Sequence, residues 1–336
     1  MKAAVAHQLG GPEVVTIESV PEPELTPGTA RVAVHSAAVN FPDLLVLAGK
    51  YQASVPPPYT PGCEFSGRVI EVAGDVDRVE PGDVVFGLAT HGAFAEQVVL
   101  DARRLTPVAD DARVDMNTLA AFGVTYTTAY HALHTFADVQ PGEYVTVLGA
   151  SGGVGLASVD LCVALGARPI AVGGDPEKLR VAADYGAVTV SDYGADDLKG
   201  RLNALTGGGS AVVVDPVGGR YSEPSLRAMR WGGRYVVLGF AAGDIPRIPL
   251  NLILLKGIRV MGFENRTIMD HLPDVAAQHR AEVLQMLVGK EIRPHIGAIY
   301  PLADVGVALG ELQRRQAIGK IVLEVGGGIT GPDRRG

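Results

Sequence analysis

The sequence predicts an α/β protein in which an all-β, barrel-like part precedes a doubly wound parallel sheet. Residues 1–122 carry short alternating runs separated by Pro-Gly turns. From residue 123 onward, short apolar runs alternate with helical stretches, and a glycine-rich turn separates the first run from the first helix. The length of 336 residues fits two domains of ~100–200 residues each.

The first part is predicted to be β-structure because its apolar residues recur with a period of two. Residues 30–35 and 65–72 alternate in this way. Pro-Gly pairs at 27–28, 61–62 and 81–82 mark turns between such runs. Repeated short strands with these turns indicate a barrel-like unit.

The second part is predicted to be a parallel sheet of about six strands with crossover helices. Residues 144–148 form a near-continuous apolar run, typical of a strand buried on both faces. A helix follows through Leu165, and another spans about 176–185. The further strands are expected at 169–172, 188–190, 211–215, 235–239 and 258–261.

The last part departs from this alternation. Helices are expected around 273–288 and 303–315, and a final strand at 320–324. They either cover the sheet or return to the first part. The glycine-rich end of the chain, from residue 326, is predicted to be a flexible tail.

Composition excludes several classes of protein. The net charge of −8, without a Lys/Arg block, argues against a nucleic-acid partner. Two cysteines, Cys63 and Cys162, are too few for a disulfide scaffold and fit a reducing compartment. No apolar run reaches the ~18 residues of a membrane span, and the first residues do not form a signal peptide. We therefore expect a cytoplasmic protein.

The glycine-rich turn predicts a dinucleotide site. Its pattern is Gly149-x-x-Gly152-x-x-Gly155, between a strand and a helix, where backbone amides and the helix N-terminus attract a pyrophosphate. Ala150 breaks the perfect G-x-G-x-x-G pattern, and no Gly-Lys-Ser/Thr follows, which excludes a P-loop. A nucleophile elbow at Ser151, with a later acid and histidine, stays open as an alternative, as does a glycine turn that serves packing alone.

The end of the second strand predicts NADPH rather than NADH. An NAD site places an acidic residue there, on the ribose 2′-hydroxyl. Here Gly173 and Gly174 follow the strand, and the first acid, Asp175, comes late. Lys178 and Arg180 stand at the start of the next helix, where cations suit a 2′-phosphate.

Beyond these patterns, the chain resembles the zinc-free NADPH:quinone oxidoreductases, the zeta-crystallin-like branch of the medium-chain dehydrogenase/reductase superfamily. The resemblance covers nearly the full length. Its motifs occur in the family's order at residues 38–43, 49–51, 61–67, 81–85, 124–129, 147–156, 238–240 and 318–323.

The resemblance implies the domain organisation and the oligomeric state. It implies a GroES-like catalytic domain at residues 1–122, a Rossmann NADPH-binding domain at 123–262, a return to the catalytic domain at 263–325 and a tail at 326–336. The cofactor would lie between the two domains. Such proteins are commonly dimers joined through an edge strand of the Rossmann sheet, for which residues 260–263 are a candidate.

The resemblance also implies that no metal is bound. Zinc-dependent relatives carry Cys, His and Cys where this chain has Asn40, Cys63 and a position near Phe122. One thiolate and one carboxylate, from Cys63 and Glu64, make a poor zinc shell.

Residue by residue, the resemblance implies a set of site residues. Asn40 and Tyr51 are the catalytic candidates, facing the nicotinamide, and Tyr51 could donate a hydrogen bond or a proton. The implied contacts to NADPH are Asn40, Tyr51, Thr127, Ser151, Gly152, Gly153, Val154, Gly174, Lys178, Tyr193, Gly239, Phe240, Phe263 and Lys320.

The predicted function is NADPH-dependent hydride transfer to a quinone, because an acceptor reduced without a metal must take hydride with little Lewis-acid help. The alternative within the same fold is reduction of a C=C bond in an alkenal, enone or enoyl thioester. A non-catalytic NADPH-binding protein, or a serine hydrolase using Ser151, is a further alternative. The expected partners are a small-molecule substrate and a second copy of the chain, with neither nucleic acid nor membrane.

Overall fold

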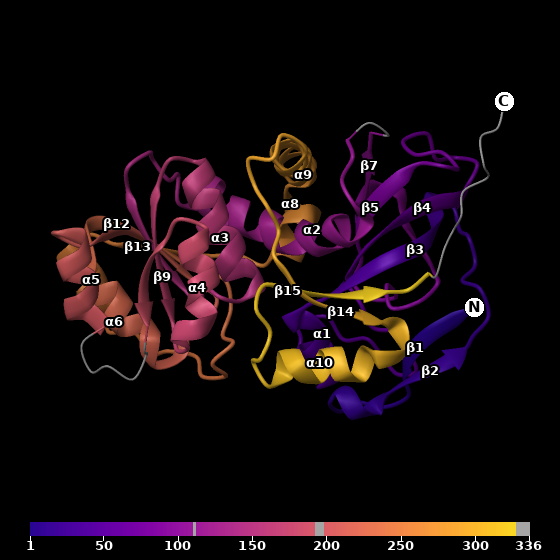
Figure 1. Cartoon of the computed structure of the whole chain (residues 1–336), viewed down its shortest axis with the longest axis horizontal. Helices are drawn as coiled ribbons and strands as arrows, with labels where there is room; N and C mark the ends of the chain where they lie inside the picture. Colours follow the sequence, from indigo (N-terminus) through magenta and orange to yellow (C-terminus); the bar gives the residue numbers. More distant parts are fainter. Residues whose placement is uncertain (110–111, 192–197, 327–336) are drawn as a thin grey trace. The chain divides into compact units, whose positions relative to one another are not determined.

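The computed structural model describes residues 1–109, 112–191 and 198–326, and the chain divides into two compact units (Figure 1). The first unit comprises Met1–Val124 and the described chain from Ile296 onward; the second is Thr125–His295. Helix α2 (Met116–Tyr130) contains the first boundary, so the chain enters the second unit inside a helix. Tyr193 and the predicted tail beyond Gly326 lie outside the described residues.

The first unit is built on a seven-stranded sheet. Its strands lie in the order β14-β15-β3-β4-β5-β7, and β6 pairs with β3 beside this path. A separate antiparallel pair joins β1 and β2. The strands are β1 (Lys2–Ala6), β2 (Val15–Ser19), β3 (Thr29–Val39), β4 (Glu64–Val72), β5 (Val84–Leu88), β6 (Gln97–Asp101), β7 (Leu105–Val108), β14 (Ile296–Pro301) and β15 (Lys320–Glu324).

The alternation seen in the sequence matches the burial along the central strand β3. Its residues are alternately buried and half-buried over most of its length, and the buried Ala30, Val32 and Val34 enter one apolar core. Helices α1 (Phe41–Leu47) and α10 (Val305–Gln313) contact each other, and α10 packs on β14 and β15 (Figure 1). The antiparallel pairing of β15 with β3 joins the late part of the chain to the early part.

The second unit contains the predicted six-stranded sheet, in which every pair of neighbouring strands is parallel. The strand order β10-β9-β8-β11-β12-β13 makes the chain change direction between β8 and β11. The strands are β8 (Tyr144–Leu148), β9 (Arg168–Gly173), β10 (Val188–Ser191), β11 (Ser210–Asp215), β12 (Met229–Val237) and β13 (Arg259–Gly262).

Helices cover both faces of this sheet, as a doubly wound topology requires (Figure 1). One face carries α3 (Gly153–Ala164) and α4 (Pro176–Asp184), which pack on β8, β9 and β10. The other carries α5 (Leu198–Thr206), α6 (Ser222–Arg227) and α7 (Leu250–Lys256), which pack on β11 and β12. Helix α3 is buried over most of its length, which explains why nearly all of its side chains are apolar, with Ser158 and Asp160 as the polar exceptions.

The return to the first unit begins at Ile296, not at residue 263 as predicted. Helices α8 (Asn265–His271) and α9 (Pro273–Val288) belong to the second unit. The reason is packing that the local sequence does not reveal. His279 of α9 lies 4.7 Å, ring centre to ring centre, from His131 of the π-helix η3 (His131–Phe136), which continues α2. No described helix has the length and apolar character to cross a bilayer.

Candidate active site

The predicted dinucleotide turn lies directly after β8, where two glycines are required by geometry. Gly149 has a φ of +63°, in the region that L-residues rarely adopt. A Cβ on Gly155 would lie 2.2 Å from the carbonyl oxygen of Gly149, so no side chain fits there. These two glycines let the turn close tightly against the first turn of α3.

The N-terminus of α3 has the features of a phosphate seat. Gly152 is the N-cap residue, no side chain caps the helix, and no acidic residue stands in its first turn. The first amides of a helix lack intrahelical partners, so those from Gly153 onward can donate to an anion. The predicted residues Ser151–Val154 are half-buried. The segment therefore fits a pyrophosphate.

The end of β9 has no acidic side chain at the position where an NAD site needs one. Gly173 is the last residue of β9, and a Cβ there would lie 2.9 Å from Leu179. The carboxylate of Asp175 instead caps α4 and accepts the backbone N–H of Glu177 at 2.9 Å. Gly174 is exposed and Lys178 half-buried beside this segment.

The loops after β11 and β12 form a second wall at the same edge of the sheet. The amide of Ala242 donates to the carbonyl of Val217 at 2.8 Å and joins the two loops. The predicted residues Gly239 and Phe240 follow β12, and Phe240 is 38% exposed. A Cβ on Gly218 would lie 2.7 Å from the Phe240 ring, so this glycine leaves room for the ring.

Asp215, at the end of β11, does not form part of a hydrolase triad. Its carboxylate accepts four hydrogen bonds from the second unit itself, and no histidine is among the donors. They are the amides of Val217 and Gly218, the hydroxyl of Ser222 and the hydroxyl of Tyr235. The arrangement fixes the loop after β11. These bonds argue against the alternative in which Ser151 is a nucleophile and a later acid, here Asp215, orients a histidine.

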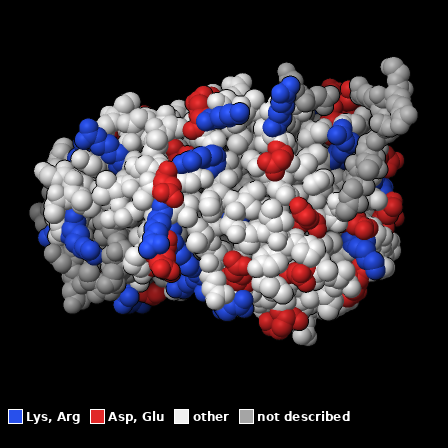
Figure 2. Space-filling model, in the orientation of Figure 1, with Lys and Arg blue, Asp and Glu red and all other residues white. Residues whose placement is uncertain are grey.

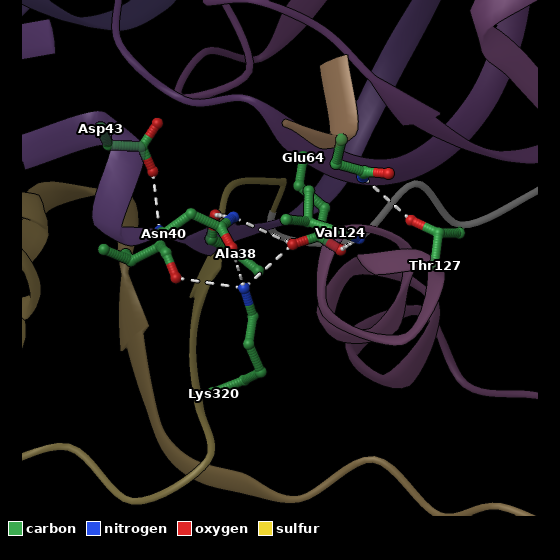
Figure 3. Close-up of polar contacts among 9 residues, drawn as sticks. Ala38, Asn40, Asp43, Glu64, Val124, Thr127 and Lys320 are labelled. Atoms are coloured by element: carbon green, nitrogen blue, oxygen red, sulfur yellow. Dashed lines mark hydrogen bonds and ion pairs between the residues drawn. The ribbon is translucent and has the colours of Figure 1, made fainter. Parts of the chain in front are cut away.

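Two further predicted residues lie in the second unit. The Phe263 ring, just after β13, stacks on Phe136 with centroids 4.5 Å apart and meets His131 edge-on. Thr127 of α2 is buried, and its hydroxyl accepts a hydrogen bond from Asn265 at 3.1 Å (Figure 3). Except for Thr127, the described site residues of this unit follow the carboxyl ends of parallel strands, where ligands bind in open α/β sheets.

The first unit contains a buried polar cluster of Asn40, Glu64 and Lys320 (Figure 3). The ammonium of Lys320 donates to Asn40 Oδ1 at 2.6 Å, to Glu64 Oε2 at 3.0 Å and to the carbonyl of Val39 at 3.2 Å. The side-chain amide of Asn40 donates to Glu64 Oε2 at 3.0 Å and to the carbonyl of Ala38 at 3.1 Å. Glu64 is fully buried and Lys320 4% exposed.

Strand register explains how residues so far apart in sequence meet. Ile321 of β15 lies opposite Val39 of β3, so Lys320 and Asn40 are the next residues across the antiparallel pair. Glu64 opens β4, the neighbour of β3. In this arrangement Lys320 orients the Asn40 amide, and the role predicted for Lys320 as a cofactor contact stays a prediction.

Asp43 and Cys63 extend this cluster and have shifted pKa values. Burial raises the pKa of Asp43 to about 7, opposed by the backbone N–H of Asn40, which donates to Asp43 Oδ2 at 2.8 Å, and by the charge of Lys320. Burial also raises the pKa of the Cys63 thiol, which hydrogen-bonds Asp43, so this thiol is a weak nucleophile at neutral pH.

The remaining predicted catalytic residue, Tyr51, lies in the loop after α1, half-buried against the core of the first unit.

The sequence prediction did not assign roles to Glu64 and Asp160. Both had a signal in the sequence: each acid stands among small and apolar residues, and an acid that becomes buried there needs partners for its carboxylate. Among the described residues, no three His, Cys, Asp or Glu side chains are grouped so as to hold a metal ion.

Comparison with known proteins identifies family models for parts of both units and relatives over nearly the whole chain. The family "Alcohol dehydrogenase GroES-like domain" matches residues 26–110, and "Zinc-binding dehydrogenase" matches residues 153–278. Quinone oxidoreductase-like protein 2 of Rattus norvegicus is 37% identical over 326 residues, covering 96% of this chain and 92% of the relative.

Two solved structures extend the comparison to the fold. The Escherichia coli quinone oxidoreductase complexed with NADPH superposes with a TM-score of 0.89 at 25% identity, covering 97% of this chain and all of that one. The quinone oxidoreductase of Thermus thermophilus, also solved with NADPH, has a TM-score of 0.83 at 32% identity and the same coverage.

A GroES-like unit combined with a six-stranded parallel Rossmann unit defines a medium-chain dehydrogenase/reductase. The chain belongs to this superfamily, in its quinone oxidoreductase-like branch.

Proposed function

We propose that the protein is an NADPH-dependent quinone oxidoreductase of the cytoplasm that works without a metal. NADPH, when bound, supplies a hydride to the quinone, and one proton from the protein or solvent completes the hydroquinone. The balanced reaction converts NADPH, H⁺ and quinone to NADP⁺ and hydroquinone. The names of the relatives support the acceptor class, and the residues of this chain support the cofactor.

The end of β9 is the observation that carries the choice of NADPH. Gly173 and Gly174 leave no carboxylate for a ribose 2′-hydroxyl, and Asp175 is already used as the cap of α4. Lys178, in the first turn of α4, is the cation nearest along the chain that could meet a 2′-phosphate. The amides at the start of α3 would hold the pyrophosphate.

The buried cluster of the first unit supports chemistry without a metal. The ammonium of Lys320 stands between Asn40 and Glu64, beside two of the positions that carry zinc ligands in zinc-dependent relatives. A divalent cation added next to this ammonium would be repelled by it. The cluster holds the Asn40 amide in one orientation, and we propose that Tyr51 donates the proton.

The test is a set of initial rates with purified protein. NADPH and NADH are each offered with a small p-quinone, with 9,10-phenanthrenequinone and with a 2-alkenal. Fast NADPH oxidation with a quinone supports the proposal. Preference for the alkenal moves the protein to the C=C reductases, and binding of NADPH without oxidation makes it a binding protein.

A pair of variants tests the cofactor choice separately. Lys178→Glu should raise the KM for NADPH about tenfold, the scale of one charge-assisted contact, and leave the KM for NADH unchanged. Arg180→Glu is the matched control, because Arg180 is exposed on the same helix. Equal effects of the two variants on NADPH would contradict a specific role for Lys178.

We also propose that two copies of the chain pair along β13. This strand is at one end of the Rossmann sheet, so its outer backbone groups face no neighbouring described strand. Exposed apolar side chains cluster on β13 and on the adjacent elements α7 and β12: Val260 is 45%, Leu250 75%, Leu254 81%, Leu255 71% and Trp231 78% exposed.

Charged residues are interspersed on the face seen in Figure 2, without a continuous basic patch among the described residues, which fits a partner other than nucleic acid.

A further inference from the structure

A buried carboxylate on α3 contacts both segments through which the chain passes between the two units. Asp160 is 6% exposed and lies about two helical turns after Gly153. Its Oδ2 accepts the Tyr126 hydroxyl at 2.7 Å and the backbone N–H of Arg293 at 2.7 Å. The unit boundaries fall after Val124 and after His295. Both passages therefore bond to one oxygen atom close to the points where the chain crosses.

The first passage is held from both of its ends. On α2, the backbone N–H of Val124 donates to Glu64 Oε1 of the first unit at 2.7 Å. Two residues later, the Tyr126 hydroxyl donates to Asp160 of the second unit. Consecutive residues of a helix are about 1.5 Å apart along its axis, so these two anchors lie within one turn.

The second passage, near Arg293, is held by contacts of both its side chain and its backbone. The guanidinium of Arg293 lies 4.2 Å from the centre of the Tyr185 ring and donates to the carbonyl of Asp184 at 2.6 Å. The Tyr185 hydroxyl donates to the carbonyl of Arg293 at 2.5 Å. These contacts fix Arg293 on the C-terminal end of α4, while its amide is fixed on α3 through Asp160.

A stabilising role alone does not explain a carboxylate at this position. Burial raises the pKa of Asp160, and the hydrogen bonds from Tyr126 and from the Arg293 amide oppose that rise. A buried carboxylate costs free energy that a well-packed apolar residue would not, although such a residue could not join two separate donors. The carboxylate is the group that can accept from both passages at once.

We propose that Asp160 is a positioning residue that holds both chain passages on α3 and so restricts the motion of one unit relative to the other. The role concerns the protein without coenzyme and does not depend on the proposed reaction. Because α3 begins at the glycine turn, a change at Asp160 also reaches the segment proposed to hold the pyrophosphate; this last link rests on the proposed function.

The test compares Asp160→Asn with wild type, both free of coenzyme. Spin labels on non-canonical amino acids at the exposed positions Asp77 and Lys199, one in each unit, report the distribution of inter-unit distances. We expect this distribution to broaden in the variant. Exchange of the Arg293 amide hydrogen should accelerate about 10- to 100-fold, the scale of a lost hydrogen bond to a charged group. Tyr126→Phe should broaden the distribution less, because only one passage is released.

Asp215→Asn is the matched control. Asp215 is also a buried carboxylate with several donors, but these lie in the loop after β11, in α6 and in β12, away from the two chain passages. It should lower stability without broadening the distance distribution. The proposal is overturned if Asp160→Asn and Tyr126→Phe keep the wild-type distribution, or if Asp215→Asn broadens it equally. None of these readouts requires turnover, so failure of the quinone assay leaves the test intact.

Discussion

At the scale of single residues, Lys320 and Glu64 form a buried pair in which each needs the other. Lys320→Met leaves Glu64 charged in a fully buried place, and we expect a loss of about 3–5 kcal/mol in the free energy of unfolding. The double variant Lys320→Met/Glu64→Gln removes both charges and should recover part of this loss. Urea denaturation measures both, and a single variant as stable as wild type would show that the pair carries no such coupling.

Asp43 makes stability depend on pH in an unusual direction for a carboxylate. Its pKa is about 7 in the folded protein, against about 3.9 in an unfolded chain. Between these values the native state keeps a proton that the unfolded state has released. Stability therefore falls as the pH rises from about 4 to about 7, by a few kcal/mol at about 1.4 kcal/mol per pKa unit.

The check is chemical denaturation across this pH range. Asp43→Asn, which cannot titrate, should show a flatter dependence than wild type between pH 4 and 7. Wild-type stability that rises steadily over the same range, with no difference from the variant, would mean that Asp43 is already ionised at low pH.

At the scale of elements, the turn between β8 and α3 tolerates a side chain at one glycine and not at another. Gly155→Ala places a Cβ 2.2 Å from a backbone oxygen. We expect it to lower the free energy of unfolding by about 1–3 kcal/mol and to weaken NADPH binding. Gly152→Ala, whose Cβ would lie 3.4 Å from its neighbour at a φ of −83°, should keep stability within about 1 kcal/mol. Thermal denaturation ranks the two, and equal losses would contradict this account.

Elements whose signals are local could be predicted from the sequence. The apolar run 144–148, the glycine turn and the alternation that follows are each contained in a few neighbouring residues, and the six-stranded sheet followed from them. The placement of α8 and α9 could not be predicted. It depends on pairs such as His131 with His279, which are 148 residues apart and carry no sign of each other in the sequence.

The candidate site shows the same division. The phosphate turn and the end of β9 were predictable because each is one short segment that directly follows a strand visible in the sequence. Lys320 was selected, but its link to Asn40 and Glu64 depends on the register of β15 against β3. Its partners at residues 40 and 64 became visible only when that register was known.

At the scale of the whole molecule, the proposed second copy gives a direct prediction. Leu254→Asp combined with Val260→Asp puts charges on the exposed apolar face beside β13 and should convert a dimer to a monomer. Val188→Asp is the control, since Val188 is 50% exposed on β10, at the opposite end of the sheet. Sedimentation velocity separates the cases, and a wild type that is already monomeric would contradict the proposal.

The split of the first unit has a consequence for the order of events during synthesis. Strand β3 leaves the ribosome early, but its partner β15 is made only after the complete second unit. The Rossmann unit can fold as one continuous piece while the first sheet still lacks a strand. During this time Glu64 lacks the ammonium of Lys320, with which it pairs in the finished fold. We expect a nascent chain stalled before residue 320 to resist proteolysis in its Rossmann part and to be cleaved readily between residues 29 and 72.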